Sequence, residues 1–130
     1  MKQLLLPVMM FGCLLAAGCN NAKSPADVAK DVGNAQDSAS REVARSENHA
    51  GKDLGSAADK VDDTLVNFNN VAARDAYNLT VAKADGDRKV ALANCEAASG
   101  DAQRVCKDQA EANYKAARAD AKAAAESQKQ

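Results

Sequence analysis

Residues 94–106 read NCEAASGDAQRVC. Alanine-rich sequence that favours helices lies on both sides of this stretch, and Ser99-Gly100-Asp101 interrupts it. Glycine readily adopts the left-handed conformation that ends a helix, and aspartate is a preferred N-cap residue. We therefore predict a chain reversal at residues 99–101 that joins two antiparallel helices.

Cys95 and Cys106 flank this predicted reversal and would face each other across it. A zinc site would need paired C-x-x-C motifs or neighbouring histidines, and a thioredoxin-like site would also need C-x-x-C; neither pattern is present. Small neighbouring side chains allow the close helix approach that a disulfide requires, with Cα atoms about 4.4–6.8 Å apart. A structural disulfide, a reversible redox pair and a metal site are the alternatives, and the cellular compartment decides between them.

The chain begins MKQLLLPVMMFGCLLAAGCNN. Lys2 supplies a positive charge, and residues 4–17 form a nearly continuous apolar run. This run is shorter than the about 20 residues that a membrane-spanning helix needs, and its proportions are typical of a secretory signal peptide. It ends in Leu15-Ala16-Ala17-Gly18-Cys19, which resembles the bacterial lipoprotein signal, in which small residues precede a lipidated cysteine. Cleavage by an ordinary signal peptidase at a nearby small-x-small site is the alternative.

The resemblance implies that residues 1–18 are removed and that Cys19 carries a covalent lipid, with residues 19–24 as a lipidated tether. Two or more acyl chains anchor a protein stably, at about 0.8 kcal/mol per buried CH2 group. In this family an aspartate after the cysteine favours retention at the inner membrane, so Asn20 implies the outer membrane, with the protein facing the periplasm. Because that compartment is oxidising, a disulfide is the expected state of the cysteine pair.

Composition limits both the fold and the partners. The 17 basic and 18 acidic residues nearly balance, which argues against nucleic acid and against electrostatic adhesion to anionic lipid. Tryptophan is absent, aromatic residues make up 3% of the chain, and alanine, the best helix former, is the commonest residue. We predict an all-α fold, an elongated bundle of two or three helices with narrow seams.

The first helix has a recognisable start. Ser24 is a suitable N-cap, Pro25 suits the first helical position, and Asp27 stands where a capping acid belongs. We predict a weak helix over 25–47, followed by a hinge over 48–56 that contains two glycines. The apolar residues of this helix recur at three- and four-residue steps: Val28, Val32, Ala35, Ala39 and Val43.

A helical hairpin is predicted over residues 57–126, with its turn at 99–101. The strongest apolar stripe of the chain repeats at alternating steps of four and three, which is typical of a helix that packs against another helix. We therefore predict a helix-packing stripe formed by Leu54, Val61, Leu65, Phe68, Ala72 and Leu79.

The sequence predicts no catalytic residue, no metal site and no small-molecule substrate. His49 is the single histidine, and the polar segment around it predicts an exposed linker. A weak metal site with Glu47 and Asp53 is the alternative. Without a second histidine or an activated nucleophile, no acid–base or covalent constellation can be assembled, so we do not expect an enzyme. No cofactor is expected besides the covalent lipid on Cys19.

Three further resemblances concern segments beyond the predicted signal peptide. The segment from Tyr77 through Ala125, with its Ala/Lys/Asp-rich helices and paired cysteines, looks like a group of small uncharacterised exported proteins of Gram-negative bacteria. The heptad-like stripes are similar to those of murein lipoprotein, whose terminal lysine joins peptidoglycan; this chain ends in Gln130, so covalent attachment is not expected. The stretch Gly51-Lys52-Asp53-Leu54-Gly55 is similar to entericidin-type lipoproteins.

These likenesses imply an envelope lipoprotein with a structural or stress-related role that acts through helix–helix interaction. Its partners would be the membrane, through the lipid, and an envelope protein or a second copy of the chain. The alternatives are a module that docks an envelope protein or peptidoglycan non-covalently, and a periplasmic redox-active thiol protein.

Overall fold

The computed structural model describes residues 22–58 and 65–128. Within these ranges the chain forms three α-helices and no strand: α1 spans Pro25–Ala58, α2 spans Leu65–Cys95 and α3 spans Gly100–Ser127. The all-α prediction is confirmed. The 34 residues of α1 rise 1.5 Å each, so this helix is about 50 Å long and the molecule is elongated.

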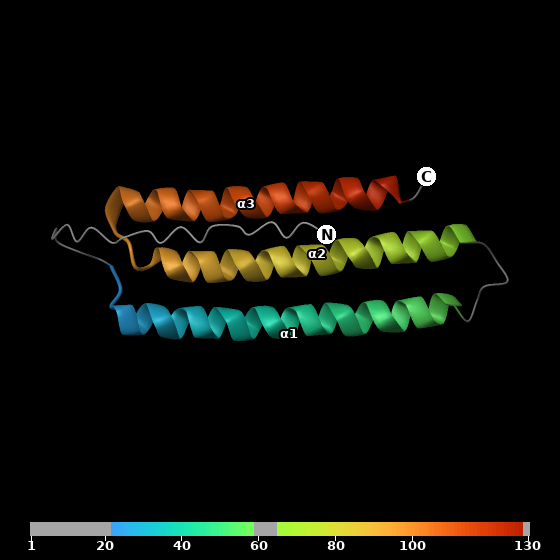
Figure 1. Cartoon of the computed structure of the whole chain (residues 1–130), viewed down its shortest axis with the longest axis horizontal. Coiled ribbons are helices and arrows are strands. Elements are labelled where there is room, and N and C mark those ends of the chain that lie inside the picture. The colour runs from blue at the N-terminus through green and yellow to red at the C-terminus, as the bar shows by residue number, and fades with distance from the viewer. Residues whose placement is uncertain (1–21, 59–64, 129–130) are drawn as a thin grey trace, which may run out of the picture.

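The helices lie side by side in one layer, with α2 between α1 and α3 (Figure 1). Both outer helices run antiparallel to α2, and the extensive contacts join α1 to α2 and α2 to α3. The layer therefore has two seams, one between α1 and α2 and one between α2 and α3. Small side chains dominate the apolar residues that are most buried: Val28, Ala73, Ala82, Cys95, Ala110 and Ala121.

The start of α1 is fixed by a reciprocal cap. The Asp27 N–H donates to Ser24 Oγ at 3.2 Å, and the Ser24 hydroxyl donates to the Asp27 carboxylate at 2.7 Å. Pro25 takes the first helical position, where its missing N–H is not needed. These contacts confirm the predicted helix start.

The predicted hinge over 48–56 is wrong, because α1 continues through both glycines of this segment and ends at Ala58. A glycine inside a helix costs about 1 kcal/mol relative to alanine, which packing against a second helix can outweigh. Leu54 is half-buried, and Asp53 forms an ion pair with Arg74 of α2. The α1–α2 seam therefore extends through the segment and holds it helical.

The predicted helix-packing stripe belongs to two helices instead of one. Leu54 lies on α1, α2 begins at Leu65, and Val61 lies outside the described residues. Two antiparallel helices that face each other both repeat at three- and four-residue steps, so the periodicity alone did not reveal the boundary. The predicted start of the helical hairpin at residue 57 is wrong for the same reason, because α2 begins at Leu65. On α2, the stripe residues Ala72 and Leu79 are half-buried and Phe68 is exposed.

Gly86 marks a very close approach of α1 and α2. It lies inside α2, which runs through it without a break. A Cβ atom at this position would lie 2.6 Å from the Cβ of Ala39 on α1. The absence of a side chain therefore lets the two helices come this close.

The chain reverses over residues 96–99, not over 99–101 as predicted. After α2 ends at Cys95, the next three N–H groups donate to carbonyls three residues earlier at 3.1–3.2 Å, which tightens the last turn. Ser99 is the N-cap of α3, and Gly100 is its first residue, with φ of +58°. The need for a glycine was predicted correctly, but the positive φ lies at the start of α3 instead of the end of α2.

Candidate functional site

The cysteine pair closes the α2–α3 hairpin beside its turn. Cys95 and Cys106 form a disulfide with Cα atoms 5.6 Å apart, within the expected range. Cys95 is 1% exposed and Cys106 is half-buried. The prediction of a hairpin closed by this disulfide is confirmed.

The residues before α1 are held against the same turn. The Lys23 N–H donates to the Glu96 carbonyl at 3.0 Å. The Lys23 ammonium lies 2.8 Å from Asp31 and 3.9 Å from the Glu96 carboxylate, whose other oxygen lies 2.7 Å from Lys107 Nζ. We call Lys23, Asp31, Glu96 and Lys107 the clasp. It joins the start of α1, the turn and α3 at one end of the molecule (Figure 1).

The charges of the clasp shift the pKa values of its members. The hydrogen bond to Asp31 raises the pKa of the Lys23 ammonium. The hydrogen bond from Lys107 lowers the pKa of the Glu96 carboxyl. A depressed carboxyl pKa means that the contribution of Glu96 to folding is present above the ordinary carboxyl pKa and is lost as the pH falls through the depressed value.

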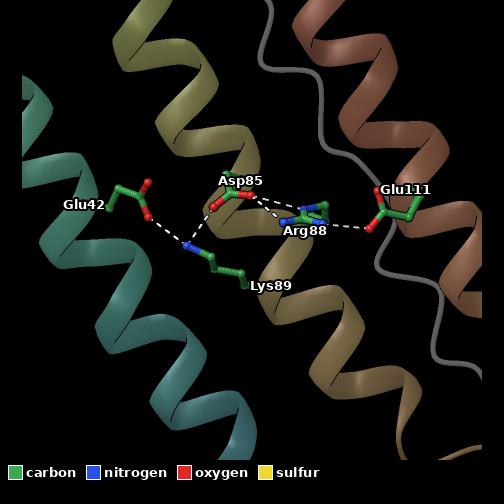
Figure 2. A network of polar contacts seen from close by, with 5 residues as sticks. All are labelled: Glu42, Asp85, Arg88, Lys89 and Glu111. Carbon is green, nitrogen blue, oxygen red and sulfur yellow. Dashed lines mark hydrogen bonds and ion pairs between the residues drawn. The ribbon is translucent and has the colours of Figure 1, made fainter.

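Midway along the layer, five charged side chains connect all three helices (Figure 2). On α2, the Asp85 carboxylate lies 2.8 Å from Arg88 and 2.7 Å from Lys89. Lys89 also lies 2.8 Å from Glu42 of α1, and Arg88 lies 2.7 Å from Glu111 of α3. We call these five residues the central network. It ties each outer helix to α2 by an ion pair.

Asp85 is the centre of this network, and its side chain is 16% exposed. Burial by itself raises the pKa of this carboxyl, but the hydrogen bonds from Lys89 and Arg88 outweigh burial and lower it. The pKa of Arg88 is raised by its hydrogen bonds to Glu111 and Asp85, and the pKa of Lys89 by those to Asp85 and Glu42. The paired charges thus hold one another in the ionised state.

Two guanidinium groups lie over the ring of Tyr114 on α3. Arg88 of α2 is 4.9 Å from the ring centroid, and Arg118 is 5.6 Å from it. A hydrogen bond with Tyr77 of α2 raises the pKa of Arg118. The contact of Arg88 with Tyr114 and that of Arg118 with Tyr77 each join α2 to α3, so both tyrosines strengthen the α2–α3 seam.

A third polar cluster lies in the half of the molecule away from the clasp. Arg74 pairs with Asp53 of α1 and lies 3.0 Å from the neighbouring Asp75. Asp75 is 6% exposed, and its Oδ2 has no hydrogen-bond partner. His49 lies 3.6 Å from Asp53 and is exposed as predicted, but it stands on a helix rather than in a linker. In residues 22–58 and 65–128, no group of three or more His, Cys, Asp or Glu side chains is arranged to hold a metal ion.

The clasp and most of the central network were missed by the sequence reasoning. The spacing from Asp85 to Arg88 and Lys89 could have been read as helical ion pairs, because residues three and four apart are neighbours on a helix. The pairs of Lys89 with Glu42 and of Lys107 with Glu96 join different helices, and their detection requires the register between those helices. Cys19, the predicted lipidation site, lies outside the described residues.

Among the helices that the structure describes, none combines the length and the apolar character that crossing a membrane requires. Comparison of the chain with models of protein families, with curated proteins and with solved structures found no match.

Proposed function

We propose that the protein is an outer-membrane lipoprotein that faces the periplasm and has a structural or stress-related role in the cell envelope, without catalysis. The observation that carries this proposal is the sequence Leu15-Ala16-Ala17-Gly18-Cys19 at the end of an apolar run. Cys19 would bear the lipid anchor, and Asn20 favours the outer membrane.

The disulfide supports an exported location. Disulfides persist in oxidising compartments such as the periplasm and are rare in the cytosol. The Cys95–Cys106 bond connects two helices whose seam is built mainly from alanine. A seam of small side chains buries little apolar area per residue, so a covalent link adds a large share of its stability.

The polar contacts support a structural role. The clasp and the central network join α1, α2 and α3 by ion pairs at two levels of the layer. Arg88, which could otherwise bind an anion, is held by Asp85 and Glu111. These side chains link helices to one another, as expected of a protein with a structural role.

The proposed helix–helix partner is an envelope protein or a second copy of the chain. Each outer helix of the layer packs on α2 with one side only, which leaves its opposite side exposed. Val105 on α3 is 60% exposed and is the most exposed large apolar side chain described. Such a side is suited to packing against another helix.

A second candidate is a module that binds an envelope protein or peptidoglycan non-covalently. The observation that favours it is a groove between α1 and α2, with apolar residues such as Val43 and Val90 in it and Gln36, Lys83 and Asn94 among its polar residues. A redox-active thiol protein is the third candidate, and the burial of Cys95 argues against it because a reductant must reach the sulfur.

Substitution of the proposed lipidation site tests the proposal. In a Gram-negative host, the Cys19→Ala precursor should stay unprocessed and should not be labelled by radioactive palmitate. The protein should no longer be found in the outer-membrane fraction. Cys13→Ala is the matched control, because it removes a cysteine of the same apolar run and should change neither processing nor labelling. Normal processing and fractionation of Cys19→Ala would exclude the lipoprotein.

A further inference from the structure

The clasp brings the proposed anchor to one end of the molecule. Ala22 is the first described residue, and the next residue, Lys23, is bonded to Glu96 in the turn between α2 and α3. Cys19 precedes Ala22 by three residues, and a fully extended chain of that length spans at most about 11 Å. A lipid on Cys19 therefore keeps this turn close to the bilayer surface.

The surface of the turn offers small side chains to lipid headgroups, and the charged residues on either side of it form ion pairs. Residues 97–100 are Ala, Ala, Ser and Gly, all small and uncharged, and Ala97 is exposed. On one side of them, Glu96 is paired with Lys23 and Lys107. On the other side, the exposed carboxylate of Asp101 lies 3.1 Å from Arg104. Contact at this end thus leaves the ion pairs of the clasp intact.

The broad faces of the layer are poorly suited to the same contact. A helix that lies flat in a bilayer interface presents an apolar face below a cationic polar face. Asp85 and Asp87 are two residues apart on α2 and therefore point to opposite sides of this helix. Asp85 lies with its partners Arg88 and Lys89, and Asp87 is exposed, so each broad face carries charged side chains along its middle. The net charge of −1 adds no attraction to anionic lipid.

We propose that the α2–α3 turn rests on the lipid headgroups and that the three helices stand away from the membrane. This orientation rests on the proposed lipid anchor and adds the lipid surface as the partner of one defined end. The far ends of α1 and α3 then lie about 40–50 Å from the bilayer, since these helices contain 34 and 28 residues. The cluster of His49, Asp53, Arg74 and Asp75 faces the periplasmic space rather than lipid.

Tryptophan fluorescence tests the orientation, because the chain contains no tryptophan. Ala97→Trp and Ala123→Trp each place one probe at an exposed position, at the turn and near the far end of α3. The full-length lipidated protein would be reconstituted into phosphatidylcholine vesicles that contain nitroxide-labelled headgroups. The two probes differ in height by roughly 35 Å, so we expect at least about five-fold stronger quenching of Ala97→Trp.

The clasp itself can be tested in the same vesicles. Lys23→Pro removes the N–H that donates to Glu96, and combined with each tryptophan variant it should reduce the difference in quenching by at least half. A difference that is unchanged by Lys23→Pro would show that the clasp does not orient the protein.

Two failures must be told apart. Intact mass of the reconstituted protein reports whether Cys19 carries the lipid, and its absence would refute the proposed function. Equal quenching of the two tryptophan variants of a lipidated protein would mean that the layer lies flat, and stronger quenching of Ala123→Trp would mean that it is inverted. Either result would overturn the orientation and leave the lipoprotein proposal standing.

Discussion

A side chain at position 86 has almost no space, since Ala39 of the facing helix lies 2.6 Å from where its Cβ would be. In exposed helices, by contrast, the replacement of glycine by alanine is favourable, because glycine costs about 1 kcal/mol. Gly33 of α1 supplies the comparison, with no atom within 4 Å of a Cβ at that position.

Gly86→Ala should therefore lower the free energy of unfolding by about 1–3 kcal/mol, as overpacking does, while Gly33→Ala should raise it by up to about 1 kcal/mol. Urea denaturation followed by circular dichroism measures both values. Ala39→Gly combined with Gly86→Ala should recover part of the loss. Similar effects of the two single substitutions would contradict the close approach of α1 and α2.

The disulfide offers a second prediction. The double variant Cys95→Ser/Cys106→Ser should lose about 3 kcal/mol of stability, since the bond closes a short loop, and its melting temperature should fall by roughly 10 °C. Thermal circular dichroism of the variant and of the fully reduced parent protein should give similar curves. An unchanged melting temperature, or reduced cysteines in periplasmic extracts, would refute the structural disulfide.

Asp85 gives a prediction about pH. Its pKa is lowered in the folded protein, so its contribution to stability is present above the ordinary carboxyl pKa and is lost as the pH falls through the lowered value. Asp85→Asn should destabilise the protein at pH 7 by about 1–3 kcal/mol, because Arg88 and Lys89 each lose a charged partner. It should also flatten the decline of stability below about pH 4.

Urea titrations at several pH values would measure this change. Asp87→Asn is the matched control, because Asp87 is exposed on the same helix. Its substitution should change the free energy of unfolding little, both at pH 7 and in acid. An identical pH dependence in both variants would show that the central network contributes nothing to folding.

At the scale of the helices, α1 is a continuous rod of 34 residues that passes through the segment predicted as a hinge. Ala50→Pro should therefore cost about 3 kcal/mol or more, because proline removes a hydrogen bond inside the helix. Gln128→Pro, just beyond α3, is the control and should cost little. Hydrogen exchange should show protected amides over residues 48–56 in the parent protein. Rapid exchange there would contradict a continuous helix and support a hinge in this segment.

The helices show which features a sequence can predict. The cap of Ser24 and Asp27 was predicted because it depends on residues three apart in the chain. The hinge was predicted wrongly because the cost of a glycine is local, whereas the packing that outweighs it comes from α2. The turn was predicted to begin at residue 99, three residues too late, because one glycine with positive φ can end one helix or begin the next.

At the scale of the whole molecule, the disulfide was predicted because the spacing of the two cysteines about the turn agrees with the predicted export signal. The clasp and the ion pairs to Glu42 and Glu111 were not, because they depend on the register of helices that are distant in sequence. Periodicity predicted that the helices pack, but not that they form a single layer with α2 in the middle.

We propose that the protein is an exported, lipid-anchored layer of helices that is closed by one disulfide. Intact mass spectrometry of the mature protein, isolated from the membrane fraction without reductant, decides whether the protein has this form. The expected mass is that of a chain beginning at Cys19, increased by a diacylglyceryl group and an acyl chain and reduced by the hydrogens lost in forming the Cys95–Cys106 bond. An unmodified chain that begins elsewhere, or a lipidated chain with both thiols free, would contradict it.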